Sequence, residues 1–233
     1  MNVTQLEEIY NRLVVRFGKP VLVPDEDPLG GLVATILSQA TSDVNSGRAY
    51  ANLRATFADW PAVRDAETSA LAASIHQGGL ANIKAARIQA ALQYITAQLP
   101  ASGASDETLD SRFAAWLSSM PITEARLALQ KIPSVGPKTA ACVLLFSLGL
   151  PSMPVDTHVY RITQRLGLVQ ARTNVNQVHE LYDATTPAEM VYPLHVLLIT
   201  HGRHICRSQH PRCTECPLLD ICPYGQHLVY PRE

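Results

Sequence analysis

The chain has 233 residues, of which 47% are hydrophobic and 17% charged, and its formal net charge is -1. This composition excludes a disordered or fibrous chain, and the length is enough for one large domain or two small ones. The near-neutral charge argues against a bulk polyanion as the partner, but it does not exclude one, because a basic face can be balanced by acidic residues elsewhere.

The longest apolar run, at residues 140–146, is shorter than the roughly 18 residues that a membrane span requires. The start, MNVTQLEEIYNRL, has glutamates where a signal peptide has basic residues. We therefore expect no membrane association and a cytoplasmic location. Disulfides are rare in that reducing compartment, so the cysteines need another explanation.

Apolar residues at helical spacing dominate the chain from its start. The first helix places Leu6, Ile9 and Leu13 on one face, and Thr4 to Glu7 is interpreted as its capping box. Asp27-Pro28 is typical of the start of a second helix. Further helices are expected at about 44–57, 80–98, 107–117, 123–131, 137–148, 156–166, 174–182 and 187–201.

No stretch alternates polar and apolar residues as a half-buried strand would, so the predicted fold class is all-α. Turn-forming residues separate the helices at 18–24, 78–79, 100–105 and 151–154. The helical pattern stops after His201, and the remaining segment is rich in Arg, His, Pro and Cys.

Four of the five cysteines stand in that last segment with the spacing C-x6-C-x2-C-x5-C, namely Cys206, Cys213, Cys216 and Cys222. A segment this polar lacks an apolar core, and a bound metal centre would supply its missing cross-links. Four thiolates suit zinc as well as an iron-sulfur cluster. Because only Cys213 and Cys216 form a close pair, the spacing favours the larger cluster. Cys142 lies in an apolar run and is interpreted as a core residue.

The stretch IPSVGPKTA, residues 132–140, predicts a hairpin between two helices. A phosphate-binding P-loop is excluded, because Pro137 stands where that motif has the glycine before its lysine. Backbone N–H groups of the hairpin and of the second helix could instead bind an anion such as a phosphate. Lys138 follows in the first helical turn, where the helix dipole disfavours a cation. It either points to solvent or a phosphate, or its amine acts as a nucleophile.

Asp156 starts another predicted helix in the stretch PVDTH, residues 154–158. Its simplest role is that of an N-cap. A carboxylate at this place could also stabilise positive charge on a sugar ring or accept a proton.

Taken together, IPSVGPKTA, PVDTH and the cysteine spacing resemble the helix-hairpin-helix DNA glycosylases of the endonuclease III family. The likeness extends to ILSQATSD at 36–43 and to GGLANIKAARI at 78–88, which resemble DNA-facing loops of that family.

The resemblance implies two helical lobes that flank a DNA-binding cleft. Residues 25–150 would form a six-helix barrel with the helix-hairpin-helix at about 123–149, and residues 1–24 with 151–233 would form the iron-sulfur domain. It also implies a [4Fe-4S] cluster on the four cysteines, rather than zinc. The partner would be double-stranded DNA with a damaged pyrimidine or an abasic site, bound by a monomer.

The implied activity is excision of oxidised pyrimidines followed by strand cleavage at the abasic site. Lys138 would be the Schiff-base lysine and Asp156 the catalytic aspartate. The same resemblance places the DNA-contacting residues at Gln39, Ala40, Leu80, Ser134, Val135, Gly136 and His158. Leu80 would insert into the gap left by the flipped base.

Three positions depart from the family pattern. Ser134 replaces the first glycine of the hairpin, and a serine there is strained if the position needs a positive φ. Ala40 occupies a place where a polar side chain would probe the duplex, because Gln39 stands one residue earlier. Ala81 is small where bulkier residues are common. The near-neutral net charge further predicts weaker, less salt-sensitive DNA binding than a basic relative shows.

Two other functions compete with this interpretation. The first is a catalytically silent, damage-sensing protein of the same fold that binds DNA. The second is a zinc-stapled helical adaptor without a role on DNA.

Overall fold

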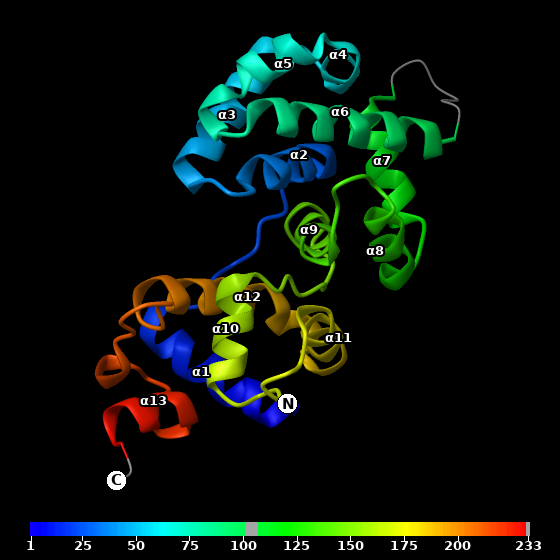
Figure 1. Ribbon diagram of the computed structural model, residues 1–233. Helices are drawn as coiled ribbons and strands as arrows, with labels where there is room; N and C mark the ends of the chain where they lie inside the picture. The colour runs from blue at the N-terminus through cyan, green and yellow to red at the C-terminus, as the bar shows by residue number, and fades with distance from the viewer. Residues whose placement is uncertain (101–106, 232–233) are drawn as a thin grey trace. The chain divides into compact units, whose positions relative to one another are not determined.

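The computed structural model describes residues 1–100 and 107–231, and each regular element within these ranges is a helix (Figure 1). The predicted all-α class is confirmed, since none of the described residues lies in a strand. Most of the predicted break at 100–105 lies outside the described residues. No helix in the described part of the chain is both long and apolar enough to cross a membrane.

The chain divides into two compact units. Residues Pro24–Leu150 form one continuous unit, here called the central unit. Met1–Val23 and Pro151–Glu233 together form the other, here called the terminal unit because it contains both ends of the chain.

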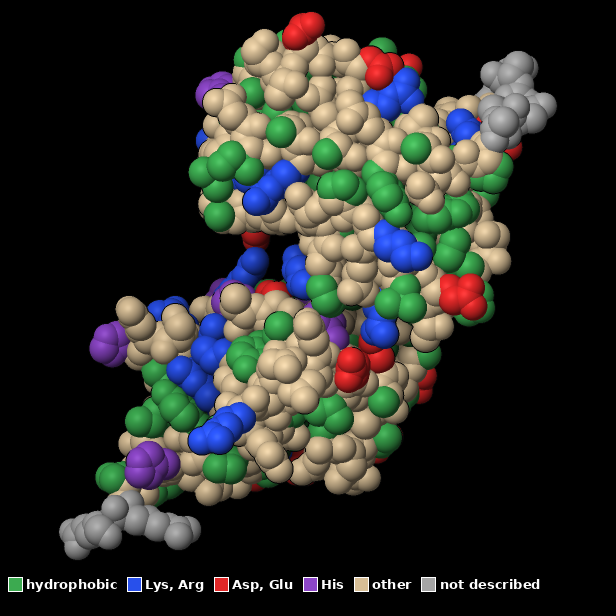
Figure 2. Space-filling view, turned by 45° about the vertical axis from the view of Figure 1, so that its right-hand side comes forward, with side chains coloured by type: hydrophobic (Ala, Val, Ile, Leu, Met, Phe, Trp, Pro, Cys, Tyr) green, Lys and Arg blue, Asp and Glu red, His purple; other side chains and the backbone are tan. Residues whose placement is uncertain are grey.

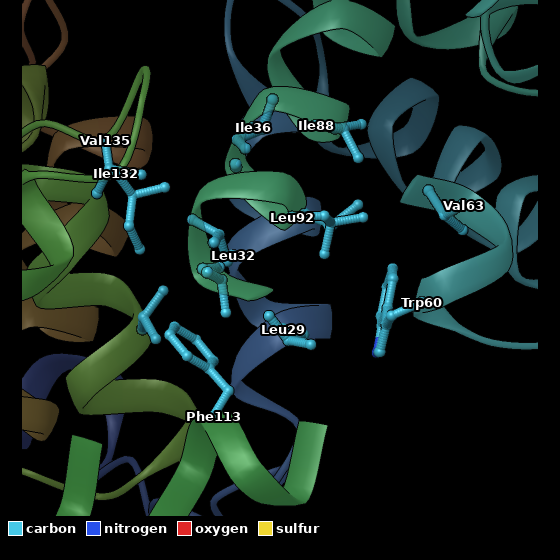
Figure 3. Close-up of a cluster of buried hydrophobic side chains, with 14 of the residues drawn as sticks. Leu29, Leu32, Ile36, Trp60, Val63, Ile88, Leu92, Phe113, Ile132 and Val135 are labelled. Atoms are coloured by element: carbon cyan, nitrogen blue, oxygen red, sulfur yellow. The ribbon is translucent and has the colours of Figure 1, made fainter. Parts of the chain in front are cut away.

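The central unit is built around one buried apolar cluster. Its helices are α2 (Pro28–Ser38), α3 (Asp43–Thr56), α4 (Trp60–Asp65), α5 (Thr68–Ser74), η1 (His76–Gly78), α6 (Ala81–Gln98), α7 (Leu109–Ser118), α8 (Ile122–Gln130), α9 (Pro137–Cys142) and η2 (Val143–Ser147). The buried cluster takes Leu32 and Ile36 from α2, Ile88 and Leu92 from α6, and Phe113 from α7 (Figure 3). Helices from distant parts of the sequence thus share one core.

The terminal unit packs the first helix of the chain against its last third. Its helices are α1 (Val3–Phe17), α10 (Thr157–Arg165), α11 (Val175–Thr185), α12 (Ala188–His204), η3 (Cys213–Glu215), η4 (Leu219–Ile221) and α13 (Pro223–Val229). Arg12 of α1 donates to the carbonyl of Pro217 at 3.1 Å and pairs with Asp220 at 2.5 Å. Both ends of the chain are therefore tied together.

The structure corrects two details predicted from the sequence. The capping box of α1 joins Asn2 and Gln5, not Thr4 and Glu7, and each member accepts a hydrogen bond from the other's backbone N–H. The chain also forms short helices that were not predicted, namely α4, α5, η1, η3, η4 and α13. Each is at most seven residues long, too short to show a full apolar repeat.

Two carboxyl groups meet at the start of α2. Asp27 caps this helix by accepting from the Gly30 N–H at 2.7 Å, and Asp110 of α7 accepts from the Leu29 N–H at 2.9 Å. Burial raises the pKa of Asp110 to about 7, and a hydrogen bond with Asp27 together with its negative charge acts in the same direction. Asp110 therefore binds a proton in the folded protein at a pH where the unfolded chain has released it.

We predict that Asp110→Asn weakens the pH dependence of stability. In the wild type, the excess proton on folded Asp110 makes the free energy of unfolding fall as the pH rises from about 4 to about 7. Asparagine keeps the acceptor for Leu29 without a charge, so at pH 8 the variant should be more stable by about 1 kcal/mol. Urea unfolding across this pH range measures the effect. The prediction would be contradicted if the free energy of unfolding depended on pH as steeply in the variant as in the wild type.

Candidate functional site

The hairpin between α8 and α9 is held by two apolar side chains. Ile132 and Val135 are 2% and 6% exposed and belong to the buried cluster of the central unit (Figure 3). Between them the chain turns tightly, because the Val135 N–H donates to the Ile132 carbonyl at 3.1 Å. Val135, expected among the DNA-contacting residues, thus has a buried side chain, and its backbone N–H is already engaged within the turn.

The rest of the hairpin faces solvent. Ser134 and Gly136 are both exposed, and no side chain caps the start of α9. A Cβ built on Gly136 would meet no atom within 4 Å, so its surroundings are open. Backbone N–H groups at this turn and at the helix start are therefore available to bind an anion.

Ser134 has a φ of 68°, in the left-handed region that favours glycine. The backbone strain expected for a serine with a positive φ at this position is therefore present. Ala40 and Leu80, in the other two loops expected to face DNA, each have a φ of 52°. Tight left-handed turns are common to all three loops.

Lys138 is the second residue of α9 and is partly buried. The expected single helix over 137–148 changes character along its length, because α9 ends at Cys142 and continues as the π-helical segment η2. Lys138 lies only four residues after Ser134, so the hairpin fixes the position of its backbone.

The two other loops expected to face DNA lie at helix ends of the central unit. Gln39 is the C-cap of α2 and accepts a hydrogen bond from Arg87 of α6 at 2.8 Å, whereas Ala40 beside it is exposed. Leu80 precedes α6, and 54% of this apolar residue is exposed. An exposed leucine on a tight turn is suited to insertion between bases.

Asp156 is the N-cap of α10 and accepts from the Val159 N–H at 2.8 Å. Its predicted capping role is therefore confirmed, and one of its oxygens is engaged in it. His158, two residues on, is partly buried, and its Nδ1 lies 3.0 Å from Arg161. Both residues belong to the terminal unit, whereas Lys138 belongs to the central unit.

The four cysteines of the terminal unit line one cavity. Cys206, Cys213, Cys216 and Cys222 are all among the residues that line this cavity. Within the described ranges, no set of three or more His, Cys, Asp or Glu side chains converges closely enough to hold a metal ion. Four sulfur donors that line one cavity without converging on a single point fit a polynuclear cluster better than one ion.

The electrostatics of this cavity disfavour free thiolates. Burial raises the pKa of Cys216 to about 11 and also raises the pKa of Cys213 and Cys222. Burial likewise lowers the pKa of His201 to about 4, so this imidazole is neutral at pH 7, and its Nε2 lies 3.7 Å from Sγ of Cys216. Iron or another cation bound to the sulfurs would supply the missing positive charge.

Two arginines of α10, which the sequence did not single out, hold the cysteine segment. Arg161 donates to the carbonyl of Cys206 at 2.9 Å. Arg165 donates to Sγ of Cys206 at 3.3 Å and lies over the ring of Tyr224, 4.3 Å from its centroid. The two arginines are four residues apart and follow Asp156, so the sequence alone indicates that both lie on one face of the helix that Asp156 starts.

Positively charged side chains lie on both units. On the face drawn in Figure 2, several Lys and Arg side chains lie close together on the unit that carries the C-terminus, and others are spread over the other unit. A net charge of -1 is thus compatible with a local basic surface.

Ser134→Gly should stabilise the protein. Glycine adopts a φ of 68° without a steric penalty, and this relief exceeds the added entropy of the unfolded chain. We expect a gain of about 0.5–1 kcal/mol in the free energy of unfolding, measured with urea. Ser119→Gly, at a residue with a φ of -77°, is the control and should not stabilise. Equal effects of both changes would contradict the assignment of strain.

Comparison with known proteins gives relatives along most of the chain. A protein of Arabidopsis thaliana that bears the name of a DNA glycosylase is 36% identical over 79% of this chain, and the match spans 59% of that relative's length. Endonuclease III of Thermotoga maritima is 30% identical over 94% of this chain and 92% of its own.

Two solved structures share the fold along almost the whole chain. One is a trapped endonuclease III-DNA covalent intermediate, with a TM-score of 0.79 and 25% identity over 98% of this chain and 99% of that chain. The other is a non-covalent endonuclease III-DNA complex, with a TM-score of 0.78 and 26% identity over the same shares.

Residues 33–187, more than half of the chain, match the HhH-GPD superfamily of base excision DNA repair proteins. AP lyase activity is typical of the endonuclease III members of this superfamily. The helix-hairpin-helix geometry, the relatives and the shared fold agree, and the chain belongs to the HhH-GPD superfamily as an endonuclease III-like DNA glycosylase of base excision repair.

Proposed function

We propose that this chain is a bifunctional glycosylase and AP lyase that excises oxidised pyrimidines from double-stranded DNA. The observation that carries the proposal is the hairpin. Its exposed backbone, with an open Gly136 and no side-chain cap on α9, stands directly before Lys138. One turn of chain would thus bind a DNA phosphate and present an amine to the neighbouring sugar.

The chemistry follows from an amine at that position. The neutral amine of Lys138 attacks C1′ of the damaged nucleotide, and the base leaves with the electron pair of the glycosidic bond and gains a proton. C1′ then carries both the Lys138 nitrogen and the ring oxygen O4′. The nitrogen loses a proton, the C1′–O4′ bond breaks with its electron pair and a proton going to O4′, and the resulting iminium ion acidifies the C2′ proton. Loss of this proton breaks the bond between C3′ and its oxygen, so the strand is cleaved 3′ to the lesion by β-elimination. The covalent endonuclease III-DNA intermediate among the structural neighbours supports this route for a related protein.

Asp156 would stabilise the positive charge that develops on the deoxyribose and help to deprotonate Lys138. Its N-cap hydrogen bond to Val159 engages one carboxylate oxygen, Oδ1, which leaves Oδ2 for this role.

The four cysteines would hold a [4Fe-4S] cluster, which supplies the cross-links that the apolar core does not. The short helices η3 and η4 between these cysteines contain no buried residue. The residues that would hold the cluster are Cys206, Cys213, Cys216 and Cys222, and Arg161 and Arg165 would keep their segment against α10. The proposed partner is damaged duplex DNA, bound by a monomer in the cytoplasm.

Borohydride trapping on DNA with an abasic site tests the Schiff base. Reduction of the iminium gives a stable amine, so we expect a covalent protein-DNA product from the wild type and none from Lys138→Ala. Lys131→Ala, at the exposed C-cap of α8, is the matched control and should trap normally. Failure of the wild type to trap on several lesions would favour the silent DNA-binding protein instead.

Asp156→Asn separates capping from catalysis when two quantities are measured, the free energy of unfolding in urea and the rate of base release from duplex DNA that contains an oxidised pyrimidine. Asparagine caps helices as well as aspartate, so the free energy of unfolding should hardly change, whereas base excision should slow by about 100-fold or more. Full activity of this variant would leave Asp156 with its capping role alone.

The purified protein should be yellow-brown and contain iron and acid-labile sulfide in equal amounts. Cys213→Ser should lose most of the iron and destabilise the terminal unit, because one ligand of the cluster is missing. Cys142→Ala is the control, because Cys142 is the last residue of α9 and does not line the cavity. This variant should keep the iron. A colourless protein that contains zinc would contradict the cluster.

A further inference from the structure

Lys84 of α6 is a charged residue buried inside the central unit. It is 1% exposed, and its Nζ donates to the carbonyl of Leu37 at 2.7 Å and to the carbonyl of Gly78 at 2.8 Å. A lysine is rarely buried to this extent unless its nitrogen is fully occupied. Its two acceptors are far apart in the sequence, so the interaction joins separate segments.

Each acceptor carbonyl lies just before a loop expected to face DNA. Leu37 is in the last turn of α2, and Gln39 and Ala40 follow it. Gly78 ends η1, and Gly79 and Leu80 follow it. Each loop contains a non-glycine residue with a φ of 52°, which is a strained backbone conformation. Contacts with the rest of the unit must therefore hold both loops in place.

Neighbouring contacts strengthen the link on both sides. Arg87, one turn after Lys84 on α6, donates to the Gln39 side chain at 2.8 Å. A Cβ built on Gly78 would lie 3.1 Å from the Cβ of Ala49 and 4.0 Å from Nζ of Lys84, so the η1 backbone packs closely on α3 and on the lysine. Burial lowers the pKa of Lys84, and the charge of Arg87 acts in the same direction. Even the neutral amine keeps two N–H donors for its two carbonyls.

We propose that Lys84 is a positioning residue that fixes the loop at 39–40 and the loop at 79–80 relative to each other, so that both enter a DNA duplex as one rigid element. This inference rests on the proposed function, in which Leu80 fills the gap left by a flipped base. Lys84 itself touches no substrate, and it acts through the backbone of the two loops.

The proposal is tested on the intact chain without any chemical step. The probe is a duplex with a reduced abasic site, which the lyase cannot cleave, and with the fluorescent base 2-aminopurine opposite that site. Insertion of Leu80 unstacks this base and raises its fluorescence. Lys84→Met should reduce the rise at saturating protein about tenfold, because two buried carbonyls lose their donors and the loops separate.

Gln89→Leu is the matched control. Gln89 is buried on the same helix, but its amide donates to the carbonyl of Ala66 at 2.7 Å and so holds the connection between α4 and α5. This variant should lose comparable stability and keep the wild-type fluorescence rise. An equal loss in both variants would show that general destabilisation is responsible and would overturn the proposal.

Lys84→Gln covers the case in which Lys84→Met does not fold. Glutamine can still donate to one of the two carbonyls, and we expect a fall of about threefold in the fluorescence rise. A folded Lys84 variant that gives the same fluorescence rise as the wild type would overturn the proposal. A wild-type protein that gives no fluorescence rise with this probe would also overturn it. Borohydride trapping of single-stranded abasic DNA, which needs no insertion, should be normal in Lys84→Met. Its failure in the wild type would instead contradict the proposed function.

Discussion

The burial of Ile132 and Val135 is the interaction on which the candidate site depends. These two side chains enter the cluster shared by α2, α6 and α7, and each contributes about 1.5–3 kcal/mol by leaving water. Between and after them the chain must turn outward, which exposes the backbone at Ser134 and Gly136. The exposed turn and the start of α9 are thus consequences of packing, and the position of Lys138 follows from both.

Three of the five non-glycine residues with a positive φ in the described part of the chain lie in loops expected to face DNA. These are Ala40, Leu80 and Ser134, and each stands in a different loop. Such conformations persist only where surrounding contacts determine them. The core fixes the hairpin and Lys84 holds the other two loops, so the central unit presents three turns from one framework.

Much of this could be predicted from residues whose signal is local. Asp27-Pro28 and Asp156 indicate where helices start, because a capping residue directly precedes its helix in the sequence. The predicted position of the capping box of α1 was wrong by two residues, because Thr4–Glu7 and Asn2–Gln5 both have the residue types of a capping box at the right spacing. The burial of Lys84 could not be predicted, since its partner Leu37 is 47 residues away and only the folded chain brings them together.

The contact of Arg12 with Pro217 and Asp220 has a consequence for how the protein is made. The central unit is continuous, so all of its contacts are available while the ribosome is still translating the last third of the chain. The terminal unit joins α1 to Pro217 and Asp220, so these contacts can form only after both residues have been made. Helix α1 packs on α12 (Ala188–His204), so it remains without this partner while about 170 residues emerge after it.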